Sequence, residues 1–141
     1  MPGLLCGAAK HLRYEANNMK LFRMMAPRLQ AEALWVTHRR WLRKVRFLNI
    51  DGLEPEFIAS ICMSLTPAIF APDDLIYGNE ELFVIYRGVA LYGGRVLTSG
   101  AVWGEDMLLE SESLRSRASA KVRSQCRARR VAHAATLRAA R

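Results

Sequence analysis

The strongest constraint on the fold is a glycine-punctuated run of short apolar segments between residues 82 and 100. β-Branched and aromatic residues fill the segments, which are interrupted at Gly88, Gly93, Gly94 and Gly100. This pattern is typical of short antiparallel strands joined by tight turns, and it predicts two or three strands over residues 82–97. Gly93 and Gly94 predict a two-residue hairpin turn, because a positive φ angle at both positions costs glycine little.

Two further strands are predicted just before this run, over residues 67–72 and 75–78. Pro72, Asp73 and Asp74 lie between them and favour a turn. Together, the segments predict a small antiparallel β-roll or barrel.

Helices are predicted ahead of the strands. Apolar residues recur at mixed spacings of three and four over residues 27–48, which favours a long helix with Pro27 in its first turn. A shorter apolar helix is predicted over residues 55–62. Trp35 and Trp41 on the long helix are candidates either for the core or for a contact between subunits, and an exposed aromatic patch would favour assembly.

A second informative motif follows the strands. It consists of two short runs, Trp103-Gly104-Glu105-Asp106-Met107-Leu108-Leu109 and Leu114-Arg115-Ser116-Arg117-Ala118-Ser119-Ala120. Together with the order of the preceding elements, it resembles the phosphate-binding cassette of cyclic-nucleotide-binding domains, in the variant found beneath voltage-gated potassium channels. The resemblance covers roughly residues 8–122. In such a cassette a glycine permits close backbone approach, a helix N-terminus presents N–H groups to an anion, and an arginine completes the charge match.

The resemblance implies an α+β fold with three parts. A helical linker would occupy residues 1–50, and residues 51–122 would form an antiparallel β-roll, a jelly-roll-like double-stranded β-helix with a short cassette helix. Residues 123–141 would then be a basic tail, disordered or weakly helical. They show no strand pattern and no apolar face of useful width, so we expect the roll to be truncated and to lack its last strands and lid helix.

The resemblance also implies a set of ligand-binding residues, with cAMP or cGMP as the ligand and with no metal or other cofactor. This set is Gly104, Glu105, Asp106, Met107, Arg115, Arg117, Ala118 and Ser119. Glu105 would bind the ribose hydroxyl, and Arg115 or Arg117 would bind the phosphate.

The chain departs from the nucleotide-binding pattern in two places. Binding members carry an arginine three residues before the small hydroxyl residue, but counting back from Ser119 gives Ser116. The loop between Gly78 and Leu82 is also short. We therefore expect the cytosolic regulatory module of a voltage-gated, potassium-selective channel, coupled to the pore and binding nucleotide weakly or not at all. The alternative is a genuine cAMP or cGMP sensor.

The expected partners are the transmembrane domain of the channel and neighbouring subunits, as in a tetramer, without specific nucleic acid. Residues 1–141 contain no run of about 18 apolar residues, so this chain is expected to lack a membrane span. The apolar start lacks a preceding basic segment, so no signal peptide is predicted. We expect this chain to lie at the cytosolic face of a membrane, and to be cytoplasmic on its own.

Charge divides the chain into three blocks. Residues 1–48 carry ten Lys or Arg and two acidic residues. Residues 49–112 carry two Lys or Arg and eleven acidic residues, and residues 113–141 carry nine Lys or Arg and no acidic residue. The positive charge of the linker indicates either proximity to an anionic membrane surface or an acidic neighbouring subunit, or simply a solvated helix face. Three interpretations of the tail remain open: electrostatic nucleic-acid binding, disorder, or a truncated or misassembled reading frame.

Candidate catalytic groups are sparse. Cys6, Cys62 and Cys126 are odd in number and far apart, which fits neither a disulfide framework nor a metal site, and Cys62 is expected in the core. His11, His38 and His133 have no metal-spaced partner. We expect His38, next to two arginines, on the surface and Trp103 in the core or at its rim. No enzyme activity is predicted.

Overall fold

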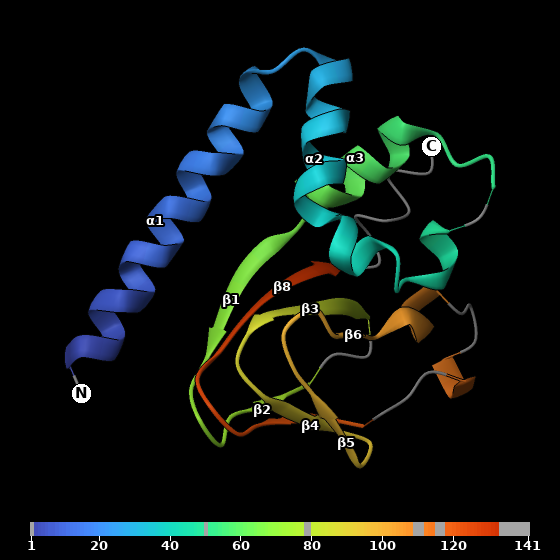
Figure 1. The fold of residues 1–141 in the computed structure, drawn as a ribbon. Helices are drawn as coiled ribbons and strands as arrows, with labels where there is room; N and C mark the ends of the chain where they lie inside the picture. Colours follow the sequence, from blue (N-terminus) through green and yellow to red (C-terminus); the bar gives the residue numbers. More distant parts are fainter. Residues whose placement is uncertain (1, 50, 78–79, 109–111, 115–117, 133–141) are drawn as a thin grey trace.

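The computed structural model describes residues 2–49, 51–77, 80–108, 112–114 and 118–132. Within these ranges, three α-helices come first and two four-stranded antiparallel sheets follow, so the α+β class is confirmed. Figure 1 shows the helices on one side of the molecule and the sheets below them. In the described part of the chain, no helix is long and apolar enough to cross a membrane.

Helices precede the strands, as the sequence predicts. They are α1 (Pro2–Met24), α2 (Pro27–Leu42), the short 3-10 helix η1 (Arg46–Leu48) and α3 (Pro55–Met63). Pro27 and Pro55 begin their helices, where the missing N–H of proline is no loss. The predicted helix over residues 27–48 is broken after Leu42, and the Asn49 side-chain amide donates to the carbonyls of Leu42, Arg43 and Val45.

The first sheet contains, in spatial order, β1 (Thr66–Phe70), β8 (Cys126–Ala132), β3 (Glu81–Arg87) and β6 (Val102–Trp103). The second contains β2 (Leu75–Ile76), β7 (Ala120–Val122), β4 (Ala90–Tyr92) and β5 (Arg95–Leu97). The chain passes repeatedly from one sheet to the other, so that strands distant in the sequence become neighbours (Figure 1).

The predicted turns are present. Gly93 and Gly94 join β4 to β5 with φ angles of 53° and 76°, and Tyr92 pairs with Arg95, which confirms the two-residue hairpin. The predicted strands on either side of Asp73 are also present, but they belong to different sheets. The turn therefore carries the chain between the sheets, and Asp73 has a φ angle of 69°.

The prediction that no strand follows Val122 is wrong, because β8 lies between β1 and β3 in the first sheet. The small side chains of Cys126 and Ala128 are buried on the inner face of this strand. On its other face, Arg129 contacts His38 of α2 and Glu15 of α1. An apolar face of ordinary width was therefore not needed for a central strand.

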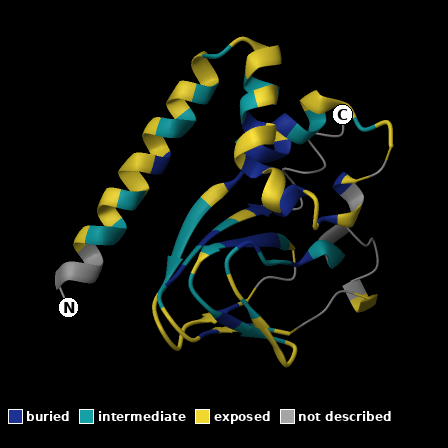
Figure 2. Cartoon of the chain, in the orientation of Figure 1, coloured by how far each residue is buried: buried dark blue, intermediate teal, exposed yellow. Residues whose placement is uncertain are grey.

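The core has two parts that meet at β3. Leu82 and Val84 pack with residues of α2 and α3, whereas Phe83 and Ile85 pack between the sheets. Figure 2 shows this concentration of buried residues in the strands and in the helices above them. Cys62 is fully buried in the first part, as predicted.

The three tryptophans have different environments. Trp103 is buried between the sheets as predicted, with its ring stacked on Phe83 at a centroid distance of 4.9 Å. Trp41 is in the core, whereas Trp35 is 38% exposed. Trp35 lines a groove of about 840 Å³ between α2 and α3, together with apolar residues such as Ala31 and Ile58.

Replacing Val131 with aspartate should abolish cooperative unfolding, because the carboxylate would be buried among the apolar side chains that pack beneath the helices. The matched control is Ala132→Asp, which places the same group at the exposed neighbouring position. Thermal unfolding followed by circular dichroism measures both variants. A Val131→Asp protein as stable as the control would contradict the central placement of β8.

Candidate functional site

The first half of the predicted cassette forms a tight turn at the end of β6. Gly104 has a φ angle of 90°, and the short 3-10 helix η2 (Glu105–Leu108) follows it directly. A Cβ atom at Gly104 would overlap the backbone carbonyl oxygen of Glu81 in β3. Glycine is therefore required here both by the backbone angle and by the close approach to β3.

The remaining residues of the predicted set are only partly described. Glu105 and Asp106 are half-buried in the first turn of η2. Ala118 is exposed and Ser119 half-buried, just before β7 in the second sheet. Arg115, Arg117 and the side chain of Met107 lie outside the described residues. The members of the predicted set that the structure describes thus lie in two segments of the chain, one after β6 and one before β7.

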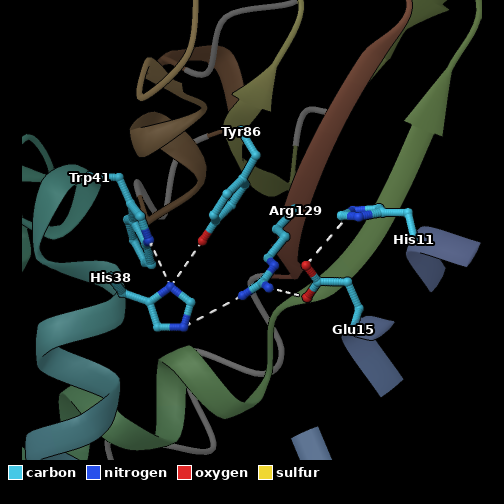
Figure 3. A network of polar contacts seen from close by, with 6 residues as sticks. All are labelled: His11, Glu15, His38, Trp41, Tyr86 and Arg129. Atoms are coloured by element: carbon cyan, nitrogen blue, oxygen red, sulfur yellow. Dashed lines mark hydrogen bonds and ion pairs between the residues drawn. The ribbon is translucent and has the colours of Figure 1, made fainter. Parts of the chain in front are cut away.

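A network of polar side chains lies where the helices meet the first sheet (Figure 3). It joins His11 and Glu15 of α1, His38 and Trp41 of α2, Tyr86 of β3 and Arg129 of β8. We call these six residues the junction network. Its members come from the first two helices and from two strands far along the chain, and its centre is buried because His38 is 1% exposed.

His38 is the centre of the junction network. Its Nδ1 atom is 2.9 Å from the hydroxyl oxygen of Tyr86, and it accepts a hydrogen bond of 3.2 Å from Nε1 of Trp41. Its Nε2 atom is 3.5 Å from Nη1 of Arg129. Tryptophan and arginine can only donate, so a doubly protonated imidazole would direct N–H groups at donors on both sides.

Arg129 connects the centre to α1. Its guanidinium donates to the carboxylate of Glu15, which also lies 3.7 Å from Nε2 of His11. The side chains of Arg129 and Glu15 are 12% and 10% exposed. The guanidinium also lies 4.6 Å from the centre of the Tyr86 ring, a cation–π contact. Because burying either charge alone is costly, each requires the other.

The environment holds the central groups in their uncharged forms. Burial, with the Arg129 charge as a second cause, lowers the pKa of His38 to about 4. Burial raises the pKa of Tyr86 to about 12, and likewise that of the nearby Cys62 thiol to about 12. Near neutral pH these groups therefore keep one protonation state, which suits a positioning contact better than proton transfer.

The sequence prediction that His38 lies on the surface is wrong. Its neighbours Arg39 and Arg40 are exposed, but His38 is one helical repeat from Leu34 and from Leu42, both of which are buried. This four-residue spacing was the available signal. Arg129 was missed because the segment that contains it showed no strand pattern.

Metal chemistry finds no support in the described residues, which contain no group of three or more His, Cys, Asp or Glu side chains placed to hold an ion. No known protein family matches the chain, and no curated protein matches it. The junction network and the turn at Gly104 are therefore the features from which a function is argued.

The stability of the protein should fall between about pH 6.5 and pH 4 through His38. The unfolded chain binds a proton near the ordinary pKa of 6.5, whereas the folded chain binds it only near pH 4. Stability from this residue is therefore complete above pH 6.5 and decreases by up to roughly 1.4 kcal/mol per pH unit below it. Urea unfolding measured across this range tests the slope.

The matched variant for this test is His38→Gln, which keeps a polar side chain but does not titrate. Its stability should depend less on pH in the same window. His11, whose pKa is also lowered, contributes in the same direction in both proteins. Equal slopes for the wild type and His38→Gln would show that His38 is not held neutral.

Proposed function

We propose that this chain is the cytosolic regulatory module of a voltage-gated channel, with potassium as the expected ion. In this proposal the two sheets form a jelly-roll-like cyclic-nucleotide-binding homology domain, and α1 and α2 belong to the linker that couples it to the pore. The observation that carries the proposal is that β3 contacts the cassette turn near one end and the linker helices near the other.

The strand arrangement supports the roll. Each sheet combines early and late strands, with β8 beside β1 and β7 beside β2. The cassette turn follows β6 and leads towards β7, which matches the order of elements in the family that the sequence resembles. The helices precede the roll and pack on the first sheet through Leu34, Trp41 and Leu42.

A physical connection from the cassette to the linker runs along β3. The backbone of Glu81 and Leu82 lies against Gly104, so a shift of the cassette turn would move the start of this strand. Five residues beyond Glu81, Tyr86 contacts His38 of α2 and lies beneath the guanidinium of Arg129. Arg129 in turn holds Glu15 of α1. In the proposal, small displacements of the cassette turn would reach the linker helices through these contacts.

The described part of the cassette favours weak nucleotide binding or none. The helix after Gly104 is a single turn of 3-10 helix of four residues, which offers few N–H groups to a phosphate. Ser116 also stands at the position where nucleotide-binding members carry arginine. The domain would then act through contacts within the channel. The alternative is a true cAMP or cGMP sensor in which Arg115 or Arg117 reaches the phosphate.

The proposed partners are the channel transmembrane domain and neighbouring copies of the chain. The groove that includes Trp35 supplies an apolar surface for a neighbouring copy, as in a tetramer. Tyr14, Leu21 and Met24 add exposed apolar side chains along α1. Exposed Lys and Arg on these helices suit a position beneath an anionic membrane surface.

Calorimetric titration with cAMP and cGMP separates the two candidate functions. For a homology domain we expect no heat of binding from folded protein up to about 1 mM nucleotide. The control is the Arg115→Ala, Arg117→Ala double variant. Micromolar binding by the wild type that is lost in the double variant would instead establish a nucleotide sensor.

Coupling along β3 is tested with Tyr86→Phe, which removes one hydroxyl. Loss of a hydrogen bond worth about 1 kcal/mol should speed amide hydrogen exchange about fivefold in α2 and also in the turn after Gly104. The matched control is Tyr77→Phe, because Tyr77 is exposed. Faster exchange confined to α2 would contradict the proposed connection between cassette and linker.

A further inference from the structure

A polar hollow of about 430 Å³ lies where the turn between β3 and β4 meets the turn between β7 and β8. It is lined by Arg87, Gly88, Ser124, Gln125 and Arg127. We call it the arginine hollow. It follows β7, whereas the predicted cassette residues Ala118 and Ser119 precede that strand, so the two places are distinct in the chain.

Close backbone contacts build the floor of the arginine hollow. Gly88 has a φ angle of 109°, and a Cβ atom there would lie 2.5 Å from the carbonyl oxygen of Gln125. The backbone N–H of Arg123 donates to the carbonyl of Val89 at 2.8 Å. The N–H of Val89 donates to the hydroxyl oxygen of Ser124 at 3.0 Å. The two turns are therefore held together.

A register shift brings the two arginines opposite each other. Ile85 pairs with Ala128 and Arg87 pairs with Arg127, with the irregularity at the intervening residue of β3. A bulge of this kind re-aims the side chains that follow it. Like charges directly opposite on neighbouring strands destabilise a sheet, so a compensating anion between them would be favourable.

Three other cationic side chains of β7 and β8 already have carboxylate partners. Lys121 lies 3.5 Å from Asp73, Arg130 lies 3.6 Å from Glu81, and Arg129 is paired with Glu15. Among the described residues, no carboxylate forms an ion pair with Arg87 or Arg127. From α1, His11 feels the charge of Arg127, which together with burial lowers the pKa of His11. The arginine hollow thus combines two guanidinium groups with no anion from the described chain.

We propose that the arginine hollow binds a small phosphate-type oxyanion. Guanidinium groups match the oxygens of phosphate with paired, charge-assisted hydrogen bonds. The Ser124 hydroxyl accepts from Val89 and still has a proton to donate, and the Gln125 side-chain amide supplies further donors. None of the residues that line the hollow is aromatic, so a phosphate group rather than a nucleotide base is the recognised part. Free phosphate and the phosphate monoester headgroup of a lipid share this chemistry.

Titration with inorganic phosphate, followed by amide chemical shifts, tests the proposal. The amide signals of Gly88 and Gln125 should move, with a dissociation constant of about 1 mM or below. Replacing both arginines, Arg87→Gln and Arg127→Gln, should weaken binding about tenfold or more. The control is the Arg43→Gln, Arg95→Gln variant, which removes the same charge from exposed positions elsewhere and should bind phosphate as the wild type does.

Arg87→Lys keeps the protein's charge while removing the paired donors, and it should bind phosphate with intermediate affinity. Flotation with phosphatidylcholine vesicles, with and without phosphatidic acid, then distinguishes the source of the anion. Vesicle binding that needs phosphatidic acid and both arginines assigns the site to a lipid headgroup. Phosphate binding without vesicle binding assigns it to free phosphate. Unmoved amide signals, or equal binding by the double glutamine variant and its control, would overturn the proposal.

Discussion

The structure depends on the ion pair between Arg129 and Glu15 at the boundary between the helices and the first sheet. A guanidinium buried in the middle of a sheet is tolerated only with a carboxylate and further polar contacts around it. Glu15 from α1 supplies the charge, and His38 and the Tyr86 ring supply the remaining contacts. Because these partners lie on three separate elements, neutralising one arginine places α1, α2 and β3 relative to one another.

Arg129 also explains why β8 can be central although its sequence is mostly alanine and arginine. The inner face of the strand needs only small side chains, because Phe83 and Trp103 fill the space between the sheets. On the outer face Val131 joins the core beneath the helices. The strand is therefore stabilised by packing on one face and by packing together with charge pairing on the other.

The proposed function and the proposed anion site depend on different parts of the first sheet. In the proposed function, coupling between cassette and linker would depend on β3, which is buried on both faces and contacts the turn at Gly104 as well as the junction network. The hollow depends on the bulge at the end of that strand, where two arginines become neighbours. In the two proposals together, displacement would pass along β3, and an anion would bind at the turns beyond the end of that strand.

The sequence by itself determined the local structure. Prolines and apolar spacing located the helices α2 and α3, and a pair of glycines located the hairpin at Gly93 and Gly94, because these features depend on backbone angles and on residues close in the chain. The tertiary structure alone decided which strands are neighbours, that His38 is buried, and that β8 completes the first sheet. Those outcomes depend on contacts such as Arg129 with Glu15, between residues more than a hundred positions apart, whose value exists only after the chain has folded.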